Sequence, residues 1–359
     1  MKVLMIGGTG LLGSQAAREL ISRGHSVHSI ALPPLPDGAL LPPEMTLTLK
    51  NSNDMTDDEL RALFTGMDGF IFAAGVDERI EGPSPIYDFF KKYNITPLER
   101  LLRLAKESGV KHVVIAGSYF SYFAKKYPEM ELTRWHPYIR SRIDQENMAF
   151  SFADENFAVS VLELPYIFGA QKGRKPVWVF LIEMLLKMKS AILYPKGGTA
   201  MVTVRQVGQA FAGALERGQG ATAYPIGWFN LTWKEMIAIM NQYMGVPDKK
   251  IITIPKFLFA MSAGQIEKQH RSAGTEGGLL MSKFVDMQTS NLFIDKEEAC
   301  LPLGVTDDDI DAAIGESVLL MYFAASSFVI ILPPKAMTRP DTSFMGKISR
   351  PRKRSYAPR

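Results

Sequence analysis

The stretch of sequence that decides the fold is KVLMIGGTGLLGSQAAREL, residues 2–20. Its first five residues, KVLMI, predict a short apolar strand, and the apolar spacing from Leu11 to Arg23 predicts an amphipathic helix. The turn between them contains Gly7, Gly10 and Gly13. A glycine loop in this position, after a strand and at the start of a helix, is typical of the first βα unit of a nucleotide-binding parallel sheet.

The three glycines have different physical tasks. Gly7 permits the tight turn, Gly10 lets the backbone approach a diphosphate without an intervening Cβ, and Gly13 lets the helix pack closely on the strand. Free N–H groups and the positive end of the helix dipole then face the phosphates. We therefore predict a dinucleotide site here, in preference to an ordinary glycine-rich turn.

Strand-like runs and helical stretches alternate from Met1 to about Leu164, as in repeated βαβ units. This alternation predicts an α/β protein with a Rossmann-type, doubly wound parallel sheet and right-handed crossovers. Helices are expected at residues 11–23, 57–65, 85–108 and 138–154. The expected strands are KVLMIG, HSVHSIAL, EMTLTLK, GFIFAAG, KHVVIAGS and AVSVLEL.

The domain organisation follows from where this alternation weakens, just after Pro165. We predict a Rossmann domain over residues 1–164. A smaller C-terminal substrate lobe of mixed structure is expected over 165–325, with segments that return to the Rossmann sheet. A basic, disordered tail is expected over 333–359. Five prolines in LPPLPDGALLPP, residues 32–43, predict a stiff, extended loop after the second strand.

Composition and charge narrow the class of protein. Hydrophobic residues make up 47% and charged residues 22%, which is typical of a globular chain. Cys300 is the single cysteine, so no internal disulfide can form, no cysteine cluster offers a metal site, and we expect a reducing, cytoplasmic location. Because the first strand begins at Val3, a cleaved signal peptide is not expected.

The net charge of +4 is unevenly distributed. The tail from residue 333 carries eight Lys or Arg against Asp341, a charge of +7, which leaves −3 on residues 1–332. No nucleic-acid partner is therefore expected. The uncharged run from Val318 to Leu332 has fifteen residues, whereas a membrane helix needs about 20. We favour a final packed helix over a membrane anchor.

Further segments agree in order and spacing with one family. The Gly-x-x-Gly-x-x-Gly pattern resembles that of the extended short-chain dehydrogenase/reductases, the family of nucleotide-sugar epimerases and dehydratases. The resemblance continues through residues 69–75, 93–118, 137–146, 162–169, 201–210 and 295–304 and covers about residues 1–320. One departure is Phe168, which replaces a tyrosine of the family's Pro-x-x-Tyr-Gly element.

The resemblance implies three catalytic positions: Ser118, Tyr138 and Arg142. In the family a serine orients the substrate oxygen, a tyrosine gives or takes the hydroxyl proton, and a lysine four residues later lowers the pKa of the phenol. Here Arg142 stands at the lysine position. It keeps the positive charge but not the size or geometry of an ammonium group.

Two functions remain open at this stage. One is an NAD(P)-dependent oxidoreductase or epimerase/dehydratase that transfers hydride at a hydroxyl or carbonyl carbon, with a nucleotide sugar as candidate substrate. The other is an NAD(P)-binding sensor or regulatory protein without turnover.

The cofactor is expected to be NAD or NADP. Neither is selected by charge, because Ala31 and Leu32 end the second strand and no Lys or Arg occurs from Ile30 to Leu49. The residues expected to contact the cofactor are Gly7, Thr9, Gly10, Leu11, Leu12, Gly13, Ala31, Asn51, Ser52, Ala73, Ala74, Gly75, Asn94, Tyr138, Arg142, Pro165 and Ile167.

Substrate contacts are expected from an aromatic and three basic residues: Tyr119, Lys172, Arg174 and Arg205. The basic residues would suit a phosphate or carboxylate group, and a solvated basic loop is the alternative. Family members commonly pair through two long helices, so a homodimer through residues 85–108 and 138–154 is a further expectation.

Overall fold

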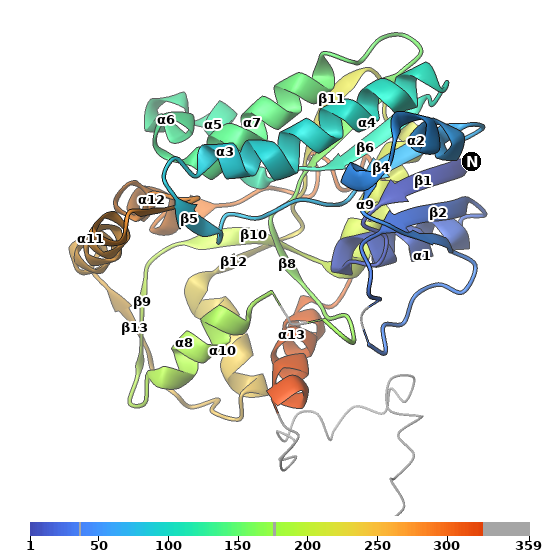
Figure 1. Ribbon diagram of the computed structural model, residues 1–359. Helices are drawn as coiled ribbons and strands as arrows, with labels where there is room; N and C mark the ends of the chain where they lie inside the picture. Colours follow the sequence, from blue (N-terminus) through green and yellow to red (C-terminus); the bar gives the residue numbers. More distant parts are fainter. Residues whose placement is uncertain (36, 175–176, 326–359) are drawn as a thin grey trace, which may run out of the picture.

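The computed structural model describes residues 1–35, 37–174 and 177–325 (Figure 1). Its centre is a seven-stranded sheet in which every neighbouring pair is parallel. The sheet confirms the predicted Rossmann-type α/β fold. In sheet order its strands are β11 (Ala221–Pro225), β7 (Ala158–Glu163), β6 (His112–Ala116), β4 (Gly69–Phe72), β1 (Lys2–Ile6), β2 (Ser26–Ala31) and β3 (Thr46–Leu49).

Helices cover both faces of this sheet (Figure 1). On one face α1 (Leu11–Ser22) and α9 (Val204–Arg217) pack together, and their apolar side chains share a core with β1 and β4. The other face is covered by α2 (Asp57–Phe64), α4 (Thr96–Glu107) and α7 (Pro137–Phe150). Strands buried on both faces explain the continuous apolar runs in the sequence.

The helix predicted over residues 85–108 is interrupted. It consists of α3 (Tyr87–Phe90), the π-helical turn η2 (Lys91–Ile95) and α4. The extra residue per turn in η2 accompanies a fully buried Asn94, whose side chain bonds the backbone of Val76. The π-helical turn therefore belongs to the carboxyl edge of the sheet, where β4 ends.

The second lobe is built around a small sheet. It contains β8 (Tyr166–Phe168), β10 (Gly198–Thr203), β12 (Phe229–Thr232) and β15 (Asn291–Leu292). Its core lies between this sheet and α8 (Val179–Lys187), α10 (Trp233–Tyr243) and α13 (Ile310–Ala325). The chain enters the lobe after β7 and returns to the Rossmann sheet through α9 and β11. The domain limits given above stay predictions.

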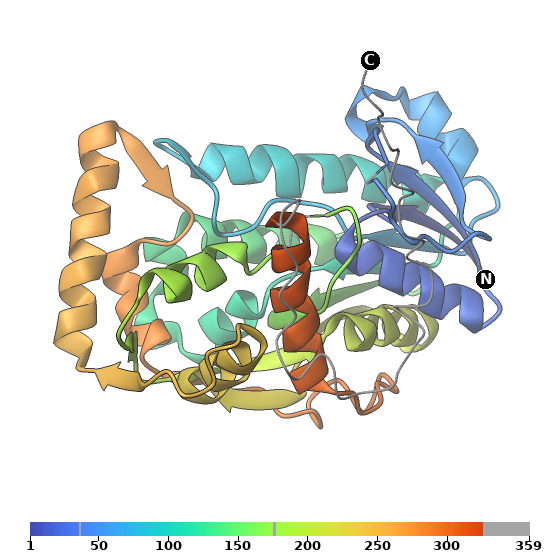
Figure 2. The ribbon, with the colours of Figure 1, turned by 90° about the horizontal axis from the view of Figure 1, so that it is seen from below.

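Several elements lie outside these two cores. At one end of the molecule α11 (Lys256–Ala273) packs on α12 (Met281–Gln288), as Figure 2 shows. Nearby, β14 (Thr275–Gly277) pairs with β5 (Glu81–Pro83), which ties this region to the loop after β4. Two further strands, β9 (Ile192–Pro195) and β13 (Ile251–Ile254), pack on the core of the second lobe. The remaining elements are α5 (Tyr119–Lys126), α6 (Leu132–Trp135), η1 (Ser52–Asp54) and η3 (Pro128–Met130).

The end of the chain is described only as far as Ala325. The first part of the predicted apolar run forms the end of α13, and the rest of it, with the basic tail at 333–359, lies outside the described residues. Within the described part of the chain, no helix combines the length and the apolar character that a membrane span requires.

Candidate active site

The glycine loop has the geometry that the sequence predicts. Gly7 has φ +90°, and a Cβ there would lie 2.6 Å from the carbonyl oxygen of Ala73. A Cβ on Gly13 would lie 2.3 Å from the carbonyl oxygen of Gly7. At Gly10 a Cβ would meet only that same oxygen, at 3.2 Å. Gly7 and Gly13 are therefore required by the packing of the protein itself. The absence of a side chain at Gly10 instead leaves open a space that a diphosphate would need.

A fourth glycine of this loop was missed by the sequence analysis. The Gly8 N–H donates to the hydroxyl of Ser29 at 3.0 Å, and a Cβ on Gly8 would lie 2.6 Å from that hydroxyl. Ser29 is a buried polar residue in β2. This bond fixes the loop against β2.

The three predicted catalytic residues come together at the carboxyl end of β6. Ser118 caps α5, Tyr138 lies in the first turn of α7, and Arg142 follows one turn later. The Arg142 Nε–H donates to the Tyr138 hydroxyl oxygen at 3.0 Å, and Ser118 also hydrogen-bonds this phenol. Tyr138 and Arg142 are 3% and 8% exposed, so the phenol lies in largely desolvated surroundings.

Arg142 is held by the protein on several sides. Its Nη1 donates to Oε1 of Gln145 at 2.9 Å, and its Nη2 donates to the carbonyl oxygen of Val76 at 3.2 Å. Gln145 in turn donates to the carbonyl oxygen of Asn94 at 2.6 Å. The guanidinium is thus fixed in one orientation against the phenol. Gln145 had not been predicted as part of the site.

Opposing influences set the pKa of Tyr138. Burial raises it above its ordinary value, the Arg142 charge and the Ser118 hydrogen bond lower it, and the nearby Glu78 carboxylate raises it further. The net result is a raised pKa, so the phenol is protonated at neutral pH. In this state Tyr138 is equipped to donate a proton.

Glu78 is a third site residue that the sequence analysis missed, after Gly8 and Gln145. It lies in the loop after β4, where burial and the neighbouring Asp77 raise its pKa. Its charge also adds to the burial that raises the pKa values of Tyr119 and Tyr166. The Glu78 charge therefore acts on the pKa values of three tyrosines. The only signal was the charged triplet at residues 77–79 directly after a buried strand.

The same loop reaches the substrate lobe through Arg79. Burial alone would raise the pKa of the Asp77 carboxyl, but its ion pair with Arg79 holds that pKa below the ordinary value. Arg79 also donates to the carbonyl oxygen of Val177 at 2.6 Å, and its Cζ lies 5.6 Å from the centre of the Phe180 ring. Arg79 thus links the Rossmann sheet to the start of α8.

An aromatic wall borders this region on the lobe side. Tyr119 was predicted to contact substrate; it is buried, and its hydroxyl oxygen accepts a hydrogen bond from Thr199 at 3.1 Å. Its ring is 6.1 Å from that of Tyr166, which stacks on Trp178 at 4.7 Å. Packing within the protein accounts for most of the surface of Tyr119.

The three basic residues proposed for the substrate lie apart from one another. Arg174 donates to the carbonyl oxygen of Thr9 at 3.3 Å, in the glycine loop. The Cε atom of Lys172 lies 3.3 Å from the position of a Cβ on Gly38, in the proline-rich loop. Arg205 forms an ion pair with Asp308 at 3.1 Å. They therefore do not form one substrate-binding cluster.

The remaining predicted cofactor residues are at the carboxyl edge or just beyond it. Ala31 ends β2 and Ala73 follows β4, beside Gly7. The Asn51 side chain is used in its own turn, where it accepts from the Asn53 N–H at 3.1 Å. Leu11, Leu12 and Gly13 form the first turn of α1, Ser52 begins η1, Ala74 and Gly75 continue the loop after β4, and Pro165 and Ile167 flank the start of β8.

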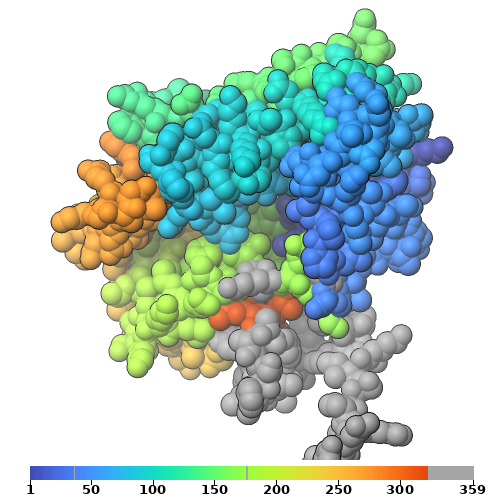
Figure 3. Space-filling view, viewed as in Figure 1, coloured from blue at the N-terminus to red at the C-terminus, as the bar shows by residue number. Residues whose placement is uncertain are grey.

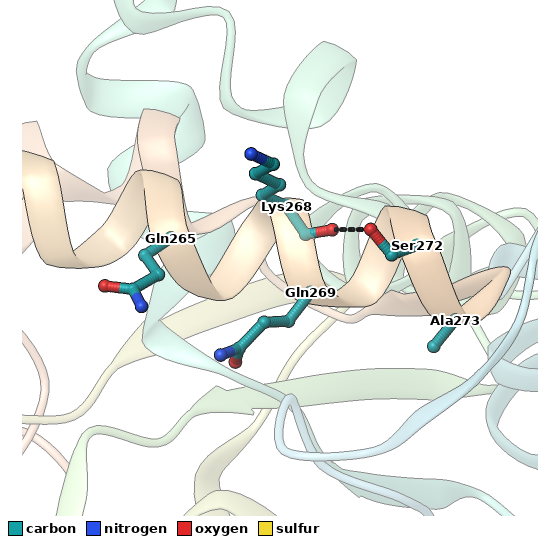
Figure 4. A pocket seen from close by; sticks show the side chains of 5 residues that line it. All are labelled: Gln265, Lys268, Gln269, Ser272 and Ala273. Atoms are coloured by element: carbon teal, nitrogen blue, oxygen red, sulfur yellow. Dashed lines mark hydrogen bonds between the residues drawn. The ribbon is translucent and has the colours of Figure 1, made fainter.

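A hollow of the surface lies on α11, away from these residues (Figure 4). Its lining consists of Gln265, Lys268, Gln269, Ser272 and Ala273, and the Ser272 hydroxyl is bonded to the Lys268 carbonyl at 2.9 Å. Figure 1 places α11 at the opposite side of the molecule from α1. Among the described residues no group of three or more His, Cys, Asp or Glu could hold a metal ion.

Comparison with known proteins identifies the family. The model of the NAD dependent epimerase/dehydratase family matches residues 3–227. The chain belongs to this family. The match includes the glycine loop, Ser118, Tyr138 and Arg142, and it confirms the predicted resemblance.

Individual relatives are distant. A UDP-glucose 4-epimerase of Lactobacillus helveticus is 28% identical over 179 residues, which are 46% of this chain and 51% of that protein. The chain therefore spans about half the length of this curated relative. The crystal structure of gox2253 has a TM-score of 0.68 at 21% identity, covering 91% of this chain and 99% of that one. MoeE5 in complex with UDP-glucose and NAD has a TM-score of 0.60 at 17% identity, covering 91% and 100%.

Proposed function

We propose that this protein is an NAD(P)-dependent epimerase or dehydratase that acts at a hydroxyl-bearing carbon of a nucleotide sugar. The observation that carries the proposal is the hydrogen-bonded set of Ser118, Tyr138 and Arg142 at the same sheet edge as the glycine loop. The family of the chain and the similarity to a UDP-glucose 4-epimerase support the substrate class.

The glycine loop fits a dinucleotide. Side chains at Gly7 and Gly13 would fill the turn itself, while the space beside Gly10 is open on its outer side. The N–H groups of the first turn of α1 would hold the diphosphate. A bound nicotinamide supplies the hydride acceptor and donor for the reaction.

The residues of this chain supply the proton chemistry. Ser118 orients the substrate oxygen by a hydrogen bond, and Tyr138 transfers the proton of that oxygen when hydride leaves or returns at the attached carbon. Arg142 stabilises the phenolate form, because its charge lies against the phenol oxygen and favours deprotonation.

A nucleotide-binding sensor without turnover is the second candidate. The raised pKa of Tyr138 favours it, since a phenol that stays protonated accepts a proton poorly. The two functions differ in one outcome, because only the enzyme converts its substrate.

A panel of UDP-hexoses and UDP-uronic acids incubated with NAD+ and the wild-type chain tests the proposal. We expect at least one compound to be converted by the wild type and not by Tyr138→Phe, which keeps the ring and removes the hydroxyl. Conversion by both proteins at equal rates would contradict the role of Tyr138. Binding of NAD+ without conversion of any compound would favour the sensor.

A further inference from the structure

A segment of the substrate lobe, residues 169–174, lies against the glycine loop. Gln171 donates from Nε2 to the carbonyl oxygen of Thr9 at 3.0 Å, and Arg174 donates from Nε to the same oxygen at 3.3 Å. Figures 1 and 3 show this part of the lobe, coloured green, beside the blue N-terminal region. Two side chains more than 160 residues away in sequence are thus anchored on one peptide of the cofactor loop.

Both side chains keep polar atoms available. Gln171 is only 8% exposed, yet its Oε1 atom is buried without a hydrogen-bond partner. A buried acceptor in this state is unfavourable unless a bound water or a ligand supplies a donor. Arg174 is exposed and uses only Nε, so its two terminal nitrogens have no partner among the described residues.

The chemistry of these atoms specifies the ligand. A guanidinium edge binds phosphate oxygens through paired hydrogen bonds. An amide oxygen accepts from a hydroxyl group, and a ribose next to a diphosphate offers such hydroxyls. The open space beside Gly10 is one residue from the anchored Thr9 peptide. A ribose-diphosphate placed there would contact α1 on one side and the side chains of Gln171 and Arg174 on the other.

We propose that Gln171 and Arg174 complete the dinucleotide site, with Arg174 binding the diphosphate and Gln171 accepting from an adjacent ribose hydroxyl. The inference rests on the proposed function, because it takes the glycine loop to bind the dinucleotide. A nucleoside-diphosphate substrate carries the same groups, but anchoring on Thr9 favours the cofactor. Arg174 is thereby reassigned from substrate to cofactor.

Lys172 provides a matched control. It lies in the same segment and carries the same charge, but its side chain packs on Gly38 in the proline-rich loop. Removing either charge changes the net charge of the protein equally. Of these two basic residues, Arg174 is the one that donates a hydrogen bond to the glycine loop.

Calorimetric titration of the full chain with NAD+ and, separately, with UDP tests the proposal. We expect Arg174→Ala to weaken NAD+ binding by about 10- to 100-fold, the usual effect of a lost charged hydrogen bond. The dependence of NAD+ affinity on salt should also decrease. Lys172→Ala should bind NAD+ within about twofold of the wild type, and the UDP affinity of Arg174→Ala should be unchanged.

Gln171→Leu tests the second contact, because it removes the Oε1 acceptor, together with the Nε2 bond to Thr9, and preserves most of the volume. It should weaken NAD+ binding by about 3- to 10-fold with no change in salt dependence. Circular dichroism verifies that each variant is folded.

The outcomes separate this inference from the proposed function. Wild-type affinity for NAD+ in Arg174→Ala, or a loss of UDP binding alone, would overturn the assignment of Arg174 and leave the proposed function intact. A wild-type chain that binds neither NAD+ nor NADP+ would overturn both.

Discussion

At the scale of single residues, Arg142 is the most informative position, because it combines a predicted charge with an unpredicted set of contacts. The sequence indicated a cation four residues after Tyr138. It could not indicate that Gln145 and the Val76 carbonyl would hold the guanidinium, since these bonds depend on how η2 and the loop after β4 pack on α7.

Substitutions of Arg142 separate its charge from its shape. Arg142→Lys keeps a cation near the phenol and should retain activity within about tenfold. Arg142→Met removes the charge that lowers the pKa of Tyr138, so that pKa should rise further and activity should fall by at least about tenfold at neutral pH. The pH dependence of kcat/KM measures both effects. Equal activity of the Lys and Met variants would mean that the charge has no role.

The buried carboxyl group of Glu163 lowers the free energy of unfolding by an amount that depends on pH. Burial raises its pKa to about 7, against an ordinary value of 4.5, although Lys125 lies 3.0 Å from its carboxylate. Below pH 4.5 the group is protonated in both the folded and the unfolded chain. As the pH rises toward 7 the unfolded chain releases the proton first, so the free energy of unfolding decreases.

The variant Glu163→Gln should remove this cost. Relative to the wild type, its free energy of unfolding should increase by up to about 3 kcal/mol between pH 5 and pH 8. Urea denaturation at several pH values measures the difference, with the exposed Glu155→Gln as control. A difference between Glu163→Gln and the wild type that does not change with pH would contradict this account.

At the scale of elements, six of the seven strands of the Rossmann sheet were predicted within three residues, because buried parallel strands form continuous apolar runs. The seventh strand, β11, was not predicted. The π-helical turn η2 was not predicted, since apolar spacing does not distinguish it from the helix around it. The short strands of the lobe, such as β8 and β15, were missed because two or three residues carry no periodic signal and their pairing is nonlocal.

The glycine loop allows a prediction that separates folding from binding. Gly13→Ala places a Cβ 2.3 Å from the backbone oxygen of Gly7, so the loop must shift. The free energy of unfolding should therefore decrease by about 1–3 kcal/mol. In Gly10→Val the Cβ would meet only the Gly7 carbonyl oxygen, at 3.2 Å, so this variant should lose less stability than Gly13→Ala and should not bind NAD+. Thermal denaturation and calorimetry distinguish the two. Unaltered NAD+ affinity in Gly10→Val would refute the predicted diphosphate position.

At the scale of the whole molecule, the Rossmann sheet and the lobe are joined by contacts that local sequence patterns do not predict. Arg79 contacts Val177 and Phe180 across nearly one hundred residues of sequence, and β5 pairs with β14 across a still longer separation. The order of the elements predicts two lobes, but the residues that join them depend on the tertiary packing. The homodimer through α3–α4 and α7 and the cytoplasmic location stay predictions.

Loss of the Arg79 contacts should weaken substrate binding more than cofactor binding. Arg79→Ala loses the bond to Val177 and the ring contact with Phe180, which together are worth about 1 kcal/mol. We expect KM for the nucleotide sugar to rise by about fivefold, with the affinity for NAD+ unchanged, since no Arg79 contact reaches the glycine loop. Steady-state kinetics and calorimetry give the two values. A loss of NAD+ affinity with unchanged KM would reverse this assignment.

The central claim is that Tyr138 transfers a proton while hydride moves to a nicotinamide held at the glycine loop. Rapid mixing of the NAD+-loaded protein with a nucleotide sugar, followed by the absorbance of reduced nicotinamide, tests it most directly. The account predicts that the wild type forms reduced nicotinamide and that Tyr138→Phe, still able to bind NAD+, forms it at least about 100-fold more slowly. Equal rates in the two proteins would contradict it.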